Sequence, residues 1–215
     1  MEIRVELPSV RLGLIEADGV RPAPHQAELA QLWSEVCEQK RQEFTLESLA
    51  EAEATRAVRA MFRSWGVDPS KYRPSSEALV RRVVQGKGLY PVLNIVDIAN
   101  LGSIETAWPY GCYDRSCIRG PIVFRAGGTG ETYEGIGKRS WHLAGKPVLA
   151  DAAGPFGSPI SDSTRTMITP LAHDVLAVIY APSSAPSSAI DTALVRLGER
   201  LSHYASALAV RSRIC

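Results

Sequence analysis

The stretch RPSSEALVRRVVQGKGLYPVLNIVDIANLGSIETAWPYGCYD, residues 73 to 114, decides the fold because two predicted helices flank a glycine break within it. Pro74 leads into the first helix, and Ser75 is expected to cap it, since a serine oxygen accepts a free backbone N–H at this position. Gly86 and Gly88 end the helix where a positive φ is needed. The chain then restarts as a second helix at NIVDIANL.

The second helix carries a polar face. Asn94, Asp97 and Asn100 recur every three residues and fall within about 120° of one another. Ile95 and Ile98 lie on the other side, which would pack into a core. Because burying an unpaired amide costs about 1 to 3 kcal/mol, the polar face requires partners. Capping and turn hydrogen bonds explain it as well as a binding site does, so both interpretations stay open.

On the N-terminal side the sequence predicts a strand and two helices. Residues 10 to 20 are β-prone and contain an Asp-Gly turn, which fits a short strand that pairs at a sheet edge. Residues 26 to 42 and 46 to 65 repeat apolar side chains with the period of amphipathic helices. Thr45 is the expected N-cap of the second of these helices, and Gly66 marks its expected end.

Arginines on these helices form a second polar feature. Arg56 and Arg59 lie on the helix at 46 to 65, and Arg81 and Arg82 lie on the next helix. They are candidates for a local basic surface, because a net charge of +1 gives no global attraction for nucleic acid. The ordinary solvated face of a helix is the favoured interpretation.

On the C-terminal side the composition becomes β-prone and rich in glycine. Residues 127 to 137 supply a turn with a short strand, so a sheet of at least four strands is expected. Residues 182 to 188 read as a flexible linker, and residues 190 to 210 as a terminal amphipathic helix. The other predicted strands lie at residues 121 to 127, 146 to 152 and 173 to 182.

The composition predicts a folded protein without a metal or cofactor. The 215 residues are 45% hydrophobic, which is ample for a core. The four cysteines form no CxxC pair, so reduced thiols are expected rather than a disulfide framework or a metal site. No secretory leader and no run of about 18 apolar residues occurs, so we expect no membrane association and a cytoplasmic location.

The motifs of the commonest catalytic sites are missing from the sequence. There is no G-x-S-x-G elbow, no HExxH and no Walker motif, and the glycines of 127 to 137 lack the context of a phosphate loop. Cys112 has no nearby histidine to lower its pKa, so a structural thiol is expected there.

A second informative segment is GPFGSPISDSTRT, residues 154 to 166. Its glycines and prolines shape a loop, which is either a surface turn or one wall of a site. Arg165 could hold a carboxylate or phosphate, and Asp162 could receive an ammonium group. An ion pair between Asp162 and Arg165 is the alternative.

Two motifs of the central stretch resemble a known family. VDIAN, residues 96 to 100, and WPYGCYD, residues 108 to 114, are similar to the VDVTN and QPMHAFD pattern in the B3/B4 domain of the bacterial phenylalanyl-tRNA synthetase β subunit. RPSSEALVRRVV before them and IRGPIVFRA after them follow the same order. The resemblance covers about residues 71 to 182, half of the chain.

The resemblance implies an editing pocket that hydrolyses the ester of a wrongly charged tRNA. Asn100 matches the asparagine of VDVTN and would bind the substrate or water, while Gly157 belongs to the counterpart of a GGIFGG-type loop that lines the pocket. From position and chemistry we add Asp97 as a second catalytic candidate. The expected substrate-binding residues are Arg73, Asn94, Tyr113, Gly157, Asp162 and Arg165, and the expected weak tRNA contacts are Arg56, Arg59, Arg81 and Arg82.

The chemistry suits these residues, although the motif departs from the family pattern. An aminoacyl ester is labile, so a site need only position water and stabilise the oxyanion, without a covalent nucleophile. Ala99 stands where the pattern has threonine, and Gly111 where it has histidine. Ser158 and Pro159 stand where a tyrosine-reading acid is expected, so tyrosine specificity does not carry over.

The sequence therefore predicts an α+β fold of the B3/B4 type. A strand and helices at 1–70 and a helix at 183–215 would pack on a core at 71–182 as one unit. The expected function is hydrolysis of mischarged aminoacyl-tRNA in trans, in association with translation components; the chain is too short for a complete phenylalanine–tRNA ligase. A non-catalytic module that binds the tRNA acceptor end or an amino acid, and a small-molecule enzyme, are the alternatives. Catalysis requires the amides at 94–100 to share one water-poor cavity with Asp162.

Overall fold

Two long strands, β2 (Val10–Asp18) and β9 (Asp174–Pro182), pair antiparallel at the centre of the molecule. Every residue of β9 after Asp174 is buried, because the strand is covered on both faces. With β3 (Tyr110–Asp114) and β10 (Ala209–Ile214) they form the central sheet, in the order β10-β2-β9-β3. The computed structural model describes residues 1–24, 26–137 and 139–215.

A second four-stranded sheet, here the outer sheet, has the order β1-β4-β7-β8. β1 runs parallel to β4, and the other pairs are antiparallel. Aromatic contacts join the two sheets: the Phe124 and Tyr180 ring centroids lie 5.4 Å apart, and those of Tyr113 and Phe156 lie 5.1 Å apart. The strands outside the central sheet are β1 (Ile3–Val5), β4 (Ile122–Ala126), β7 (Pro147–Asp151), β8 (Gly154–Gly157) and the hairpin β5 (Thr132–Gly135) and β6 (Arg139–His142).

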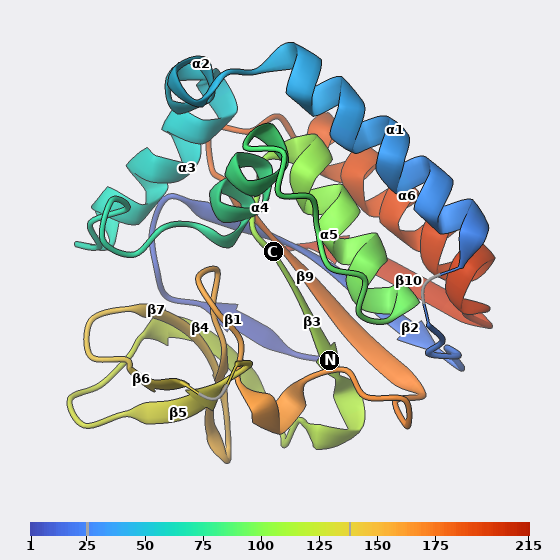
Figure 1. The fold of residues 1–215 in the computed structure, drawn as a ribbon. Helices are drawn as coiled ribbons and strands as arrows, with labels where there is room; N and C mark the ends of the chain where they lie inside the picture. The colour runs from blue at the N-terminus through green and yellow to red at the C-terminus, as the bar shows by residue number, and fades with distance from the viewer. Residues whose placement is uncertain (25, 138) are drawn as a thin grey trace.

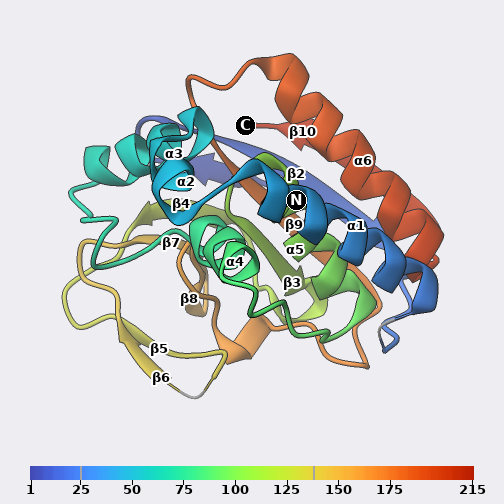
Figure 2. The same cartoon turned by 45° about the horizontal axis from the view of Figure 1, so that its top comes forward.

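Helices cover the other side of the central sheet (Figures 1 and 2). α5 (Asn94–Thr106) contacts β3, and α6 (Ser187–Ala205) contacts β2 and β10. α1 (Ala27–Glu43) lies over α5, next to α4 (Ser75–Val84). The remaining helices are α2 (Leu46–Glu51) and α3 (Glu53–Ser64). Within the described ranges, no helix has the length and apolar character to cross a bilayer.

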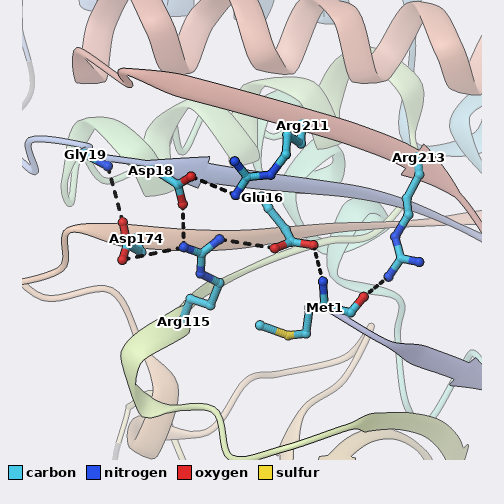
Figure 3. A network of polar contacts seen from close by, with 8 residues as sticks. All are labelled: Met1, Glu16, Asp18, Gly19, Arg115, Asp174, Arg211 and Arg213. Atoms are coloured by element: carbon cyan, nitrogen blue, oxygen red, sulfur yellow. Dashed lines mark hydrogen bonds and ion pairs between the residues drawn. The ribbon is translucent and has the colours of Figure 1, made fainter.

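A network of ion pairs connects the four strands of the central sheet (Figure 3). Arg115, directly after β3, lies between Glu16 and Asp18 of β2 and Asp174 of β9. The Met1 ammonium contacts Glu16 at 2.7 Å. Arg211 of β10 reaches Asp18, also at 2.7 Å, so the network spans the sheet from β3 to β10.

The α+β class, the C-terminal helix and most element positions predicted from the sequence are confirmed. Thr45 caps α2 through a reciprocal pair of hydrogen bonds with Ser48. Gly86 and Gly88 adopt positive φ after α4. The three strands predicted after residue 114 correspond to β4, β7 and β9.

Several details were predicted wrongly. The helix expected at 46–65 is broken at Ala52, whose extended ψ of 137° separates α2 from α3. Ser75 is not the cap of α4; Pro74 holds that position, and the buried Ser75 hydroxyl has no hydrogen-bond partner among the described residues. The strand at 10–20 is interior rather than an edge strand, because β10 pairs with its other side.

The C-terminal part was also predicted incompletely. α6 begins at Ser187, inside the expected linker, and ends at Ala205, five residues before the predicted end at 210. The chain turns at Ser206, where φ is 54°, and residues 209–214 form β10. The portions 1–70, 71–182 and 183–215 each contribute a strand to the central sheet; their division stays a prediction.

Candidate functional site

Asp162 is a partly buried carboxylate in the loop between β8 and the short 3-10 helix η2 (Thr164–Thr166). Its Oδ1 accepts a hydrogen bond from the Tyr113 hydroxyl at 2.8 Å and from the Ser158 backbone N–H at 3.0 Å. Its Oδ2 has no hydrogen-bond partner within 1–24, 26–137 and 139–215. One oxygen is therefore fixed, and the other is left for a water or a ligand.

Two tyrosines from the central sheet pack against Asp162. The Tyr113 hydroxyl lies 3.0 Å from that of Tyr180 on the neighbouring strand β9, and both side chains are fully buried. The Tyr113 ring meets Phe156 of β8 edge to face. Tyr133 of β5 donates a hydrogen bond to the Ser161 carbonyl, which holds the loop from the hairpin side. The loop is therefore anchored at three points.

The environment of Asp162 raises its pKa to about 7. Removal of the carboxyl from water is the dominant cause, and the hydrogen bonds from Ser158 and Tyr113 oppose it. The pKa values of Tyr113 and Tyr180 are raised well above 10 by burial and by the neighbouring Asp162. Near pH 7, Asp162 therefore exchanges protons while the two tyrosines stay neutral, which is the behaviour required of a general base.

Cys112 is not a suitable nucleophile. Burial, followed by the charge of Asp162, raises the pKa of its thiol to about 12. The thiol therefore stays protonated at neutral pH, in agreement with the structural role expected from the sequence.

The Arg165 side chain makes its ion pair and hydrogen bonds with other residues of the protein. Its guanidinium pairs with both oxygens of the Asp151 carboxylate, at 2.9 and 3.1 Å, and donates to the Cys117 and Gly154 carbonyls. The alternative of an Asp162–Arg165 ion pair was wrong in its partner, since the carboxylate is Asp151. We do not assign substrate binding to Arg165, because both of its terminal guanidinium nitrogens already bond to the protein.

The polar groups at the start of α5 serve the helical layer. Asn94 is fully buried; its amide donates to the Arg21 and Tyr204 carbonyls, at 3.1 and 2.7 Å, and accepts from the Ala23 N–H at 3.0 Å. Asp97 is also fully buried, and its carboxylate accepts from the Val92 N–H at 3.0 Å. Of the two interpretations of this polar face, turn and loop hydrogen bonding holds for both residues.

The expected shared cavity is therefore not formed. Within the described parts of the chain, no hydrogen bond joins Asn94 or Asp97 to Asp162, whose partners are Tyr113 and Ser158. The reason lies in the alternation of β3: Tyr110 faces Gly102 of α5, whereas Tyr113 faces Phe156 of the outer sheet. The amides and the acidic loop thus lie on different faces of the central sheet.

Asn100 and Arg73 remain accessible. Asn100 is half-buried on α5, and its side chain has no hydrogen-bond partner in the parts of the chain that the structure describes. Arg73 is exposed and lies 3.6 Å from Glu77. Next to it, the Ser75 N–H donates to the Pro159 carbonyl at 3.0 Å, which connects the start of α4 to the loop of Asp162.

The four arginines expected to contact tRNA differ in their surroundings. Arg59 makes a bidentate ion pair with buried Glu77, at 2.7 and 2.8 Å. Arg82 stacks 4.2 Å from the centre of the exposed Tyr90 ring, and Arg56 is exposed. Arg59 is therefore neutralised, and a free basic surface would rest on the other three.

Sequence reasoning missed Tyr180 and Ser158 as partners of the cluster. Tyr180 is the one residue with a polar group in the apolar run VLAVIYAP of β9, which was a usable signal. The contact of the Ser158 backbone N–H with Asp162 depends on the loop conformation, and no residue type signals it.

Together these features define an α+β domain with a tyrosine–carboxylate cluster between its sheets. Residues 57–206 match the model of the B3/4 domain, and the chain belongs to this family. It is 32% identical over 114 residues to the phenylalanine–tRNA ligase β subunit of Symbiobacterium thermophilum, across 48% of this chain and 13% of that subunit. The resemblance of the chain to the B3/B4 domain of the synthetase β subunit is thereby confirmed.

A solved structure of another phenylalanyl-tRNA synthetase β subunit is also similar to the chain. The crystal structure of an N-terminal fragment of the phenylalanyl-tRNA synthetase β-subunit from Pyrococcus horikoshii aligns over 99% of this chain and 50% of that chain, with a TM-score of 0.46 and 14% sequence identity. The chain spans half or less of the length of both relatives.

Proposed function

We propose that the chain is an aminoacyl-tRNA deacylase that acts in trans on mischarged aminoacyl-tRNA, with Asp162 as its catalytic residue in place of Asn100 and Asp97, because the polar groups of α5 lie on the other face of the central sheet. The observation that carries the proposal is a carboxylate with a pKa of about 7, fixed through Oδ1 and unpaired at Oδ2. It lies beside Gly157, in the loop that resembles the editing loop of the family. Membership of the B3/4 family supports a substrate that contains tRNA.

The proposed step is hydrolysis of the ester by water held at Asp162 Oδ2. The carboxylate takes a proton from the water as its oxygen bonds to the ester carbonyl carbon. When the tetrahedral intermediate collapses, the C–O bond to the ribose breaks and the ribose oxygen receives the proton from Asp162. General base catalysis of this kind contributes about 10²- to 10⁴-fold to a rate.

Arg73 completes the proposal as a substrate-binding residue, because it is exposed next to the end of the Asp162 loop. Asn100 lies on α5 with Asn94 and Asp97, on the other face of the central sheet, so the role expected for it beside Asp162 is not proposed. Exposed Arg56, with Arg81 and Arg82, would contact tRNA phosphates weakly. A cytoplasmic location and association with translation components belong to the same proposal.

A non-catalytic module that binds the acceptor end or the amino acid is the second candidate. It is favoured by Ala99 and Gly111, which lack the polar side chains of the family motif. In that case the Asp162 carboxylate would hold the α-ammonium group of the amino acid rather than a water.

The proposal is tested by incubating the protein with a panel of mischarged tRNAs and measuring release of the amino acid. Asp162→Asn is expected to slow release at least about 100-fold, because an amide cannot accept the proton. Asn100→Ala is expected to leave release unchanged, because Asn100 lies on the other face of the central sheet from Asp162. Asp191→Asn, which changes an exposed carboxylate on α6, is the matched control.

The remaining outcomes decide between the candidates. Unchanged release by Asp162→Asn would contradict its catalytic role. Retention of charged tRNA without turnover by the wild type would favour the binding module. If neither tRNA nor amino acid binds, a small-molecule enzyme becomes the better description.

A further inference from the structure

Gly111 and Gly157 face each other across the Tyr113 hydroxyl. A Cβ added at Gly111 would lie 2.1 Å from the Tyr113 hydroxyl oxygen, and one added at Gly157 would lie 2.4 Å from it. Real Cβ atoms essentially never approach another heavy atom within 3.0 Å. Neither glycine has a positive φ, so the backbone does not demand glycine at these positions. Glycine is required at both positions because the buried Tyr113 side chain leaves no room for a Cβ.

The Tyr113 hydroxyl, which lies between these two glycines, is the group that fixes Asp162. We infer that Tyr113 is a positioning residue: its hydroxyl, held between Gly111 and Gly157, orients Asp162 through Oδ1 and leaves Oδ2 for the reaction. The catalytic part of this inference rests on the proposed function, whereas the contact with Asp162 does not. Tyr180, 3.0 Å behind the Tyr113 hydroxyl, and Phe156, edge-on to its ring, restrict the tyrosine to this orientation.

The same geometry means that a side chain at position 111 and the hydrogen bond from Tyr113 to Asp162 exclude each other. The ring carbon Cζ of Tyr113 would also lie only 2.6 Å from a Cβ at either glycine, so the whole ring would have to move. Tyr113 is fully buried and packed, and its ring cannot shift without losing the hydrogen bond to Asp162. Gly111→Ala and Tyr113→Phe therefore break one and the same contact by different means.

The titration of Asp162 reports on this contact. The groups that face it are Tyr113 from β3, Tyr180 from β9 and Tyr133 from β5, and Cys112 lies on the other face of β3. The pKa of each is raised by burial and by Asp162, so they stay neutral near pH 7. The Tyr113 hydroxyl donates to Asp162 and favours its charged form. Loss of this hydrogen bond should raise the pKa of Asp162.

The first experiment is an NMR titration of the Asp162 carboxyl carbon in the whole chain. We expect Tyr113→Phe to raise the pKa of Asp162 by about one unit, the usual effect of a hydrogen bond to a charged group. Gly111→Ala should raise it similarly, and the double variant should raise it no further. An unchanged pKa in Tyr113→Phe, or additive shifts in the double variant, would overturn the inference.

Two variants control for general damage to the fold. Tyr110→Phe removes a hydroxyl from the opposite face of the same strand, and Gly128→Ala adds a Cβ whose nearest neighbour would be an ordinary 3.5 Å away. Both should leave the Asp162 titration unchanged. If Tyr113→Phe does not fold, Gly111→Ala decides the question alone.

The second experiment is the pH profile of ester hydrolysis. Tyr113→Phe should move the acid limb of kcat to higher pH by the shift seen in the titration, with KM changed less than kcat. A profile that keeps its wild-type midpoint while the rate falls would indicate a merely structural role. If the wild type hydrolyses no ester while the pKa of Asp162 shifts as expected in the variants, the proposed function fails and the Tyr113–Asp162 contact stands. If the wild type is active but the pKa of Asp162 does not shift in the variants, only the positioning role of Tyr113 is removed.

Discussion

The two asparagines of α5 show what residue-scale reasoning could and could not predict. The sequence correctly indicates that Asn94 and Asp97 share a polar face that needs partners. The partners of Asn94 come from residues 21 and 23 and from Tyr204, more than 70 positions away on either side, and no local pattern identifies them. Asn100, three residues after Asp97, stays half-buried and without a partner in the described parts of the chain, so neighbouring members of one face have different roles.

At this scale we predict that Asn94→Ala lowers the free energy of unfolding by about 3 kcal/mol. The change leaves the Arg21 and Tyr204 carbonyls and the Ala23 N–H without their partner, and each unpaired buried group is costly. Asn100→Ala should change stability by less than about 0.5 kcal/mol. Urea unfolding measures both. Equal losses in the two variants would contradict the structural role of Asn94.

At the scale of elements, long periodic segments were predictable and short or interrupted ones were not. β10 was missed because its apolar and charged residues continue the composition of α6, and only residues 206–208, which begin with the left-handed Ser206, separate the two elements. The break at Ala52 has no glycine or proline to signal it. The partner of Glu77 could not be predicted either, because Arg59 lies on a different helix, 18 residues earlier.

The Arg59–Glu77 pair leads to a prediction about how α3 and α4 are joined. Arg59→Ala should cost about 3 kcal/mol of unfolding free energy, because it leaves the carboxylate of Glu77, only 4% exposed, with one distant partner, Arg73. Adding Glu77→Ala should restore part of the loss. Arg56→Ala, at an exposed position on the same helix, is the control and should be nearly neutral. Similar urea midpoints for the two single arginine variants would contradict the prediction.

At the scale of the whole molecule, the network around Arg115 ties strands from distant parts of the chain into one sheet (Figure 3). Partial burial works to raise the pKa values of Glu16 and Asp18. The hydrogen bonds and charges of the Met1 ammonium, Arg115 and Arg211 outweigh it, so both values are lowered. A lowered carboxyl pKa means stability that is present above the ordinary values of 4.5 and 3.8 and is lost as the pH falls through the lowered ones.

We therefore predict that Arg115→Met destabilises the protein more at pH 7 than at pH 3. At pH 7 the two carboxylates are charged and lose the one cation that they share, whereas at pH 3 much of their contribution is already gone in the wild type. Thermal unfolding at the two pH values measures the difference. Arg196→Met, which changes a half-exposed arginine outside the network, should show no such pH dependence. An Arg115→Met penalty equal at both pH values would rule out the network as its source.

The pairing of β2 with β9 and β10 has a consequence for biosynthesis. β2 is synthesised well before its two neighbours, residues 174–182 and 209–214, so it lacks its first partner until β9 has been made and its second until translation reaches residue 214. At ordinary elongation rates this delay is roughly 10 to 40 seconds. During that time the apolar side chains of β2, among them Leu12, Leu14 and Ile15, are exposed on the nascent chain, and a holding chaperone would have its clearest target there.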